Sequence, residues 1–177
     1  VFNGGTLRYG AAVTGGFSSQ FAALSGSAAI LDTNGQDITL TSPITGAGGL
    51  IKRGSGTLTT AAGSTYTGGT TVEAGILKSG AGSATNPFGA TGSMITVKSG
   101  ATVDVNWISA SSTVHTYAGA QYQITVEGRG VADTSNTVFG GFVGAITSSG
   151  TYDTTAQPFS HMILTGDTTV SGLMGGT

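Results

Sequence analysis

Short segments in which apolar and polar residues alternate recur along the chain, and glycines separate them. Residues 57–60, 94–98, 101–106 and 122–127 follow this pattern. A period of two residues places successive side chains on opposite faces of a β-strand. Such strands are too short to bury a core alone. The pattern therefore predicts short strands that cover one another in a stack, as in a solenoid.

One stretch, residues 46–80, contains this whole pattern of short strands separated by glycines: GAGGLIKRGSGTLTTAAGSTYTGGTTVEAGILKSG. The threonine, valine, leucine and tyrosine side chains suit a pleated, half-buried surface, and glycine suits the bends between strands. The side chains that we expect to point inward are Leu50, Leu58, Tyr66, Val72 and Leu77. The glycines that we expect at turns are Gly48, Gly49, Gly54, Gly56, Gly68, Gly69 and Gly75.

Four segments outside this stretch have distinctive local patterns. Phe17, Phe21 and Leu24 have helical spacing, so residues 17–24 are interpreted as a short helix or a loop, with a strand as the alternative. Asn34-Gly35 predicts a turn between two strands. The segment 86–89, Asn-Pro-Phe-Gly, is expected to be a loop leaving the rod, because proline removes a ladder donor. Residues 165–172 echo 67–72 and predict a further rung, as the turns of the coil are called here.

Composition and charge exclude several classes of partner. Charged residues make up only 8% of the chain, the formal net charge is −2, and cysteine is absent. The six basic residues are scattered in sequence, so no basic stripe for nucleic acid is expected. No apolar run approaches the roughly 18 residues of a membrane-spanning helix. We expect no cofactor.

The sequence shows no strong catalytic or metal-binding motif. The acidic residues form neither adjacent pairs nor an Asp-x-Asp, although acids from different rungs could still meet. His115 and His161 are the only candidate imidazole bases, and two histidines without cysteine make a poor zinc set. Asp32, Asn34 and Asp37 could be half of a calcium loop, but turn chemistry explains them better. We expect neither a metal site nor enzymatic activity.

Three aromatic residues are candidates for ligand contact. Trp107, Tyr117 and Tyr122 lie in the part of the chain that is richest in polar and aromatic residues, and with Phe88 they could stack on sugars or contact a host protein. The alternative is that these side chains fill corners of the rod or cap its core.

The motif of the central stretch resembles the passenger-associated transport repeat, also called the autotransporter-associated β-strand repeat, of bacterial autotransporter passengers. The matching segments are GGLIKRGSGTLT at 48–59, YTGGTTV at 66–72 and AGIL at 74–77. The resemblance implies a right-handed single-stranded parallel β-helix, an all-β solenoid, at the bacterial cell surface or in a secreted product. It also implies a polypeptide with further rungs and a C-terminal membrane β-barrel.

Residues 1–177 are therefore interpreted as a single β-helix segment and as a fragment of a longer passenger, because the chain opens on residues that align with the end of the central repeat. With about 20–25 residues for each rung, the chain would form about seven to nine rungs. We expect a structural stalk that supports secretion, folding and display, and end-to-end self-association through open ends. The alternatives are an adhesin for host glycan or protein and, third, a carbohydrate-active β-helix enzyme.

Overall fold

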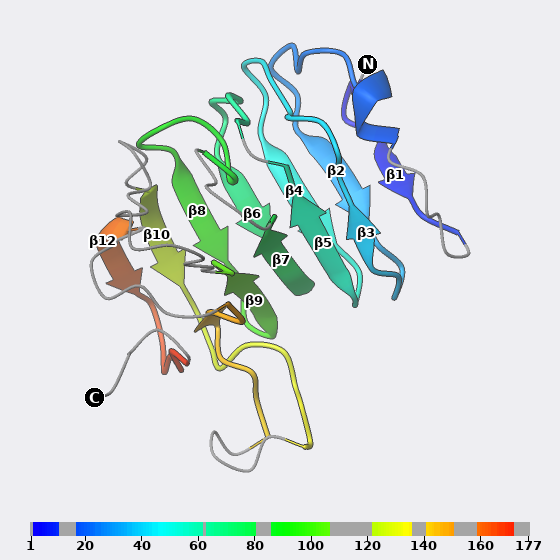
Figure 1. The fold of residues 1–177 in the computed structure, drawn as a ribbon. Coiled ribbons are helices and arrows are strands. Elements are labelled where there is room, and N and C mark those ends of the chain that lie inside the picture. The colour runs from blue at the N-terminus through cyan, green and yellow to red at the C-terminus, as the bar shows by residue number, and fades with distance from the viewer. Residues whose placement is uncertain are drawn as a thin grey trace.

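The computed structural model of the chain describes residues 2–10, 17–61, 63–80, 86–106, 122–135, 141–150 and 159–171. These residues form two parallel sheets and one short 3-10 helix, η1 (Phe17–Gln20) (Figure 1). The strands of the seven-stranded sheet are, in order across it, β1 (Thr6–Arg8), β2 (Ala29–Asp32), β4 (Leu50–Arg53), β6 (Thr70–Val72), β8 (Met94–Val97), β10 (Tyr122–Val126) and β12 (Phe159–Leu164). Those of the five-stranded sheet are β11 (Ile146–Thr147), β9 (Ala101–Asp104), β7 (Gly75–Ser79), β5 (Thr57–Thr60) and β3 (Ile38–Thr39).

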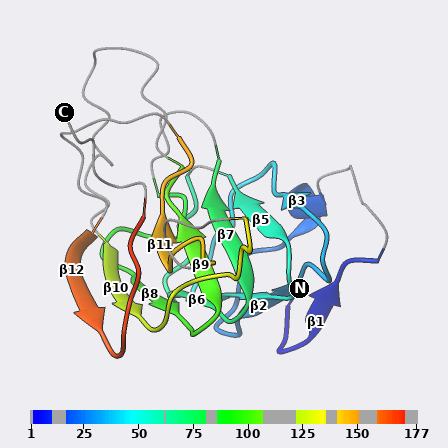
Figure 2. The same cartoon turned by 90° about the horizontal axis from the view of Figure 1, so that it is seen from below.

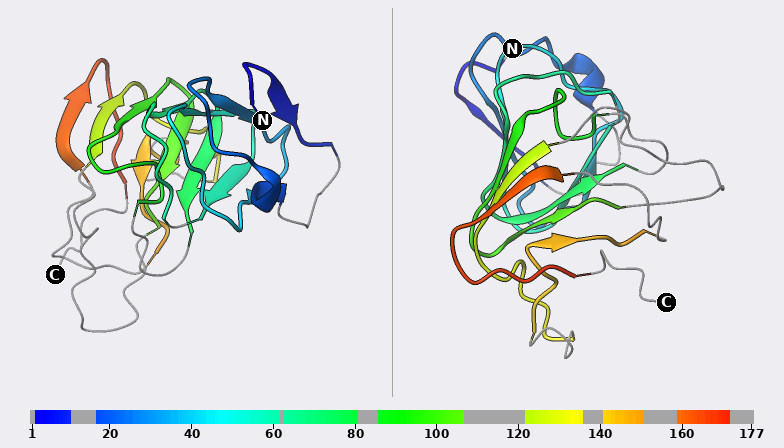
Figure 3. Two further views of the ribbon diagram at one scale, coloured as in Figure 1. Left: turned by 90° about the horizontal axis from the view of Figure 1, so that it is seen from above. Right: turned by 90° about the vertical axis from the view of Figure 1, so that its left-hand side faces the viewer.

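From β2 onward, successive strands belong alternately to the two sheets. Each strand pairs in parallel with the strand that follows two elements later, for example β4 with β6 and β5 with β7. Viewed along the row of strands, the strands within each sheet overlap one another, and the two sheets form two walls of one coil (Figure 3, right). This arrangement confirms the predicted parallel β-solenoid, in which each strand is covered by the equivalent strand of the next rung.

The length of a rung is regular in the centre of the coil and grows toward its C-terminal end. Ile51 lies opposite Thr71, twenty residues later, within the range predicted from the sequence. Ile124 lies opposite Met162, thirty-eight residues later. The number of residues between paired strands therefore grows, while the strands keep their stacking.

A third side of the coil is built without regular strands. Backbone hydrogen bonds nevertheless link its rungs: Thr65 N–H donates to the Ile44 carbonyl at 2.9 Å, and Ala90 N–H donates to the Tyr66 carbonyl at 2.9 Å. Among the described residues, the inward side chains of this side are Leu24, Ile44, Tyr66 and Phe88, one from each of four successive rungs and all buried. Residues 65–67, which hold the inward Tyr66, belong to this irregular side.

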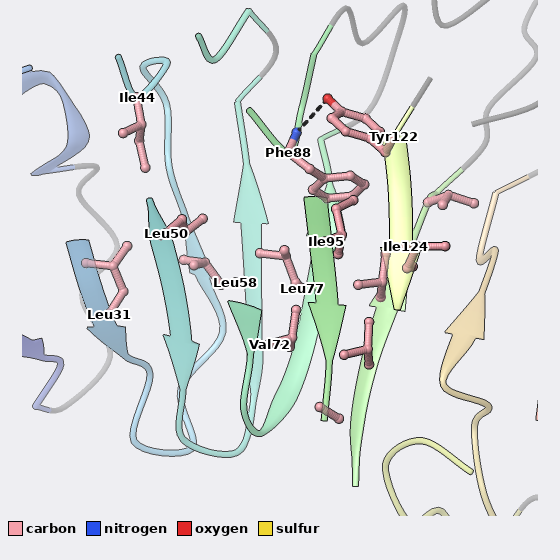
Figure 4. Packing of buried hydrophobic residues seen from close by; sticks show 14 of the residues in the cluster. Leu31, Ile44, Leu50, Leu58, Val72, Leu77, Phe88, Ile95, Tyr122 and Ile124 are labelled. Carbon is pink, nitrogen blue, oxygen red and sulfur yellow. Dashed lines mark hydrogen bonds between the residues drawn. The ribbon is translucent and has the colours of Figure 1, made fainter. Parts of the chain in front are cut away.

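The core is a column of apolar side chains between the three sides (Figure 4). Burial alternates along β4, β5, β6 and β7: in β7 the inward residues are fully buried and those between them are partly exposed. The register places apolar side chains of successive rungs over one another, so Leu58 lies between Ile38 and Leu77 of the neighbouring rungs. Removing this apolar surface from water is the main stabilising term for such a fold.

Two local interpretations of the sequence need correction. The segment 86–89 does not leave the rod, because Phe88 is fully buried and its ring lies 5.9 Å from the ring of Tyr122. Asn86 instead takes a positive φ of 53° and turns the chain back inward. The last rung is also placed differently: β12 precedes the residues that echo the repeat, and of these Val170 forms an isolated parallel bridge with Ile146.

Candidate functional site

The most unusual group in the described part of the chain is a lysine inside the rod. Lys52 lies on β4 at an inward position, opposite Leu31 on one side and Val72 on the other. Its side chain is fully buried. A buried ammonium group is unfavourable unless hydrogen bonds replace its water shell.

Four oxygen atoms surround the Lys52 ammonium group. The distances from Nζ are 3.0 Å to Thr33 Oγ1, 2.9 Å to the Arg53 carbonyl, 2.6 Å to the Gly54 carbonyl and 3.0 Å to the Ala74 carbonyl, so the three N–H donors are shared among four acceptors. Thr33 follows β2, Gly54 follows β4 and Ala74 follows β6, so the acceptors come from three successive rungs. One side chain thus ties three turns of the coil together at the same corner.

Gly75 makes room for this arrangement. Its φ is +69°, and a Cβ atom there would lie 2.5 Å from the carbonyl oxygens of Gly54 and Gly56 and 2.8 Å from Lys52 Nζ. Any side chain would therefore push apart the atoms that bind the ammonium group, and the positive φ would be strained as well.

Burial lowers the pKa of Lys52 to about 8, and the carboxylates of Asp32 and Asp37 oppose this shift. Because the ammonium donates into the protein on all sides and is shielded from water, it has no access to an external substrate. The geometry is that of an internal cross-link between rungs.

The depressed pKa predicts a pH dependence of stability. Above about pH 8 the folded chain releases this proton, whereas the unfolded chain keeps it up to the ordinary pKa of 10.5. The unfolded state then binds more protons, so the free energy of unfolding rises with pH between about 8 and 10. We expect a gain of roughly 1–2 kcal/mol from about pH 7.5 to about pH 9.5, measured by urea denaturation.

Lys52→Met should abolish this gain, because it removes the titrating group and keeps an unbranched side chain of similar length. The matched control is Lys98→Met, at an exposed position, which should leave the gain in place. The stability of the two variants should be compared below about pH 10. Burial raises the pKa values of Tyr9 and Tyr66 in the folded chain, so at higher pH the ionisation of these tyrosines in the unfolded chain favours unfolding. A gain that persists in Lys52→Met would contradict the assignment.

Charged residues that are scattered in sequence line up on the outer face of the seven-stranded sheet. The backbone pairing places the following residues at equivalent positions of successive rungs: Arg8, Asp32, Arg53, Glu73, Lys98 and Glu127. The sign of the charge alternates at every step. Arg8 Nε lies 3.5 Å from Asp32 Oδ2, and Arg53 donates to both carboxylate oxygens of Glu73, at 2.5 and 3.3 Å. We call this row the charge ladder.

Reversing one sign should reveal the electrostatic contribution of the charge ladder. Glu73→Lys puts a third positive charge between those of Arg53 and Lys98. We therefore expect this variant to have a lower unfolding temperature at low salt. The decrease should shrink in high salt, because ions screen exposed charges. Glu73→Gln, which removes the charge without reversing it, is the control and should have a smaller effect. Equal shifts for both variants at both salt concentrations would rule out repulsion.

A second polar cluster joins β7, β9 and the segment after β11. Lys78 Nζ donates to Ser149 Oγ at 2.7 Å and lies 3.5 Å from Asp104 Oδ2, while Ser149 N–H donates to Asp104 Oδ1 at 3.0 Å. A serine beside a lysine can act as a nucleophile only when the amine accepts the hydroxyl proton. Here the ammonium is paired with a carboxylate and is itself the donor, so the cluster links rungs.

The structure places the five candidate core residues Leu50, Leu58, Tyr66, Val72 and Leu77 in the interior, each 0–1% exposed. Among the candidate turn glycines, those with a positive φ are Gly54, Gly56, Gly69 and Gly75. The remaining three, Gly48, Gly49 and Gly68, lie where a Cβ atom would collide with the backbone of a neighbouring rung. Those three positions thus allow close approach of two backbones.

Of the three candidate ligand-contact aromatics, Tyr122 alone lies within the described residues. Trp107 and Tyr117 lie outside the described residues. Tyr122 is fully buried, and its hydroxyl accepts from Phe88 N–H at 3.2 Å and donates to the Gly89 carbonyl at 3.1 Å. Of the two interpretations of Tyr122, the structure supports the second: it is a core residue and cannot stack on an external ligand.

The candidate bases and metal ligands that the structure describes have other roles. His161 is exposed on β12, and His115 lies outside the described residues. Asp32 accepts the backbone N–H of Asn34 at 2.9 Å, which is turn chemistry, whereas Asp37 accepts the backbone N–H of Thr57 in the next rung at 2.8 Å. Within the described ranges, no group of three histidine or acidic side chains could hold a metal ion. The described part of the chain also contains no helix of the length and apolarity needed to span a bilayer.

Sequence reasoning overlooked Lys52. It treated the residue as one of six scattered basic residues, although its position relative to Leu50 already indicated an inward side chain. Leu50 and Lys52 are two residues apart in a strand, so the period of two places both on the same face. This spacing of two residues from Leu50 could have identified Lys52 as an inward, buried side chain.

The fold and this site together define a parallel β-solenoid whose rungs are linked through an internal ammonium group. Residues 50–78, which include Lys52, Gly54 and Ala74, match the family model described as the passenger-associated-transport-repeat. The chain therefore contains such a repeat, in agreement with the resemblance in its sequence to bacterial autotransporter passengers. Comparisons with curated proteins and with solved structures gave no match.

Proposed function

We propose that this chain is a non-catalytic stalk segment of a bacterial autotransporter passenger, exported to the cell surface or released from it. The observation that supports this role is that the match to the passenger repeat coincides with the most regular part of the solenoid, the rungs of twenty residues around Lys52. In this proposal the segment provides stiffness and a stable fold, and other parts of the polypeptide provide any specific activity.

The arrangement of the rungs explains how such a segment would assist export. Each rung uses the previous one as a template, through parallel backbone pairing and through the three-rung contacts of Lys52. A chain that emerges through a pore could therefore fold one rung at a time, and each folded rung would hinder backward movement. Stability of the repeat and yield of exported protein should then vary together.

Cell fractionation of the producing bacterium tests the proposal. We expect peptides from residues 50–78 in the surface or culture-medium fraction, and protease added to intact cells should cleave this segment. Leu58→Asp, which destabilises the core, should lower the exported amount, whereas Thr59→Asp on the outer face should not. The proposal fails if the segment stays in the cytoplasm, or if both variants are exported equally although only one of them is destabilised.

A further inference from the structure

The strands of the seven-stranded sheet lie side by side along one side of the molecule (Figure 2). The chain covers part of its other sheet itself: Thr102 and Asp104 point outward from β9 and are nevertheless buried. Thr102 Oγ1 donates there to the Gly144 carbonyl at 2.8 Å and accepts from Val131 N–H at 3.0 Å. On β2, β4, β6 and β8 of the seven-stranded sheet, by contrast, all outward side chains are half-buried or exposed.

Backbone pairing arranges these outward side chains in three rows along the rod. The first row is the charge ladder. The second row consists of β-branched residues, which are Ile30, Ile51, Thr71, Thr96 and Thr125. The third row has almost no side chain on three rungs and a large one on the next: Ala28, Gly49, Gly69 and Met94, of which Met94 is 39% exposed.

The charge ladder is complementary to its own reversed copy. Its signs alternate, so a two-fold axis that runs along the strands, midway between β4 and β6, pairs every charge with one of opposite sign. Arg53 then faces Glu73 of a second copy, and Asp32 faces Lys98. The remaining charges of the ladder pair in the same way. Stacked sheets lie about 10 Å apart, a gap that a long basic side chain and a carboxylate side chain bridge together.

The same axis also matches the two uncharged rows. It places Ile51 of one copy opposite Thr71 of the other, so an apolar side chain meets a threonine methyl group. It places Met94 of one copy opposite Ala28 of the other. The exposed methionine therefore lies over the part of the face where side chains are smallest.

A copy with the opposite polarity does not fit this face. A two-fold axis along the rod would keep the two rods parallel and reverse the direction of the strands. The charge ladder of each copy would then lie over the row that contains Gly49, Gly69 and Met94. Charges would lose water there without gaining partners, which is unfavourable.

We propose that the outer face of the seven-stranded sheet binds the same face of a second copy of this chain, with the two rods antiparallel. The inference does not rest on the proposed role in export, and it uses neither end of the rod. Because each copy uses the same surface, the contact closes on itself as a symmetric dimer. Seven strands by five residues give roughly 500 Å² on each copy. This area is near the lower limit for specific contacts, so association should be reversible.

Site-specific cross-linking tests the arrangement. The chain has no cysteine, so Ile30→Cys and Thr96→Cys each introduce a single thiol into the 177-residue chain. In the antiparallel dimer, position 30 of one copy lies opposite position 96 of the other. A short bismaleimide should therefore cross-link an equal mixture of the two variants much more than either variant alone. Equal cross-linking of one variant with itself would contradict the antiparallel register.

Charge reversals in the same cysteine pair separate binding from folding. Arg53→Glu in both partners sets carboxylates opposite each other and should lower the cross-linked fraction at least about tenfold. Arg53→Glu in one partner and Glu73→Arg in the other restore opposite charges at both contacts, so cross-linking should return. Each of these chains lacks its own internal Arg53–Glu73 pair, and mixing would not repair a folding defect.

Thr39→Glu is the control for added charge. Thr39 is exposed on the outer face of the five-stranded sheet, so this substitution should leave the cross-linked fraction unchanged. The proposal is overturned if the cysteine pair without charge reversals gives no cross-link at the highest concentration reached. It is also overturned if the mixture with complementary charges fails to recover.

Discussion

Leu58→Asp should destabilise the solenoid by about 4 kcal/mol or more. Leu58 is fully buried on β5, between Ile38 and Leu77 of the neighbouring rungs. The substitution removes apolar packing and brings a carboxylate into a layer whose facing side chains on both sides are apolar. The expected result is a large decrease in the midpoint of urea denaturation, followed by circular dichroism.

Thr59→Asp is the matched control for this prediction. Thr59 is the next residue of the same strand, lies on the outer face, and is opposite Lys78 in the neighbouring rung. The same carboxylate is exposed to water there and lies beside a cation, so we expect a change within about 0.5 kcal/mol. If both variants unfolded at the same midpoint, the inward assignment of Leu58 would be wrong.

Gly48→Ala should have the second largest effect, about 3 kcal/mol, although it adds only one methyl group. A Cβ atom at Gly48 would lie far inside van der Waals contact with the Ser27 carbonyl oxygen and 2.8 Å from Leu24 Cβ. The Gly48 carbonyl also accepts from Gly68 N–H at 3.0 Å. The neighbouring rungs therefore hold this backbone from two sides, and it cannot move away without breaking pairing.

Gly5→Ala provides the comparison, because it makes the same chemical change in open space. A Cβ atom at Gly5 would meet no atom within 4 Å, and the residue has no positive φ. Restricting the unfolded chain should make this variant neutral or slightly more stable. Thermal unfolding of the two variants side by side measures the difference, and a Gly48→Ala protein as stable as Gly5→Ala would show that the rungs can separate at this corner.

The strands of the central rungs could be predicted because two independent signals agree there. In residues 57–60 and 94–97, side chains alternate with a period of two, and glycines lie close to the segments. The alternation also indicated which side chains point inward, since a shift of one residue would expose every apolar group. Fold class followed from the same pattern, because strands this short must stack.

The third side of the coil could not be predicted in this way. Tyr66 and Phe88 are fully buried, but they lie in segments whose backbone is bent and has no regular period. The proline before Phe88 suggested a loop that leaves the rod, and this was wrong. Only the stacking of successive rungs determines that these two side chains fill the same corner of the core.

The last rung was missed for a related reason. The sequence FSHMIL of β12 has no alternation, and five of its six residues are exposed. Its identity as a strand depends on pairing with β10, which is thirty-eight residues earlier in the sequence. The charge ladder has the same origin, because its members are neighbours only after the coil has formed.

The direction of the backbone hydrogen bonds has a mechanical consequence. The strands lie across the rod, and the hydrogen bonds between them run along it. Tension between the two ends of the rod would therefore break the hydrogen bonds of one strand pair after another. Each folded rung adds only about 4.8 Å to the length of the rod. When a rung of twenty residues opens, however, it releases up to about 70 Å of extended chain. A pulled rod of this design would therefore lengthen in discrete steps from its ends, and the rungs still wound would keep their shape.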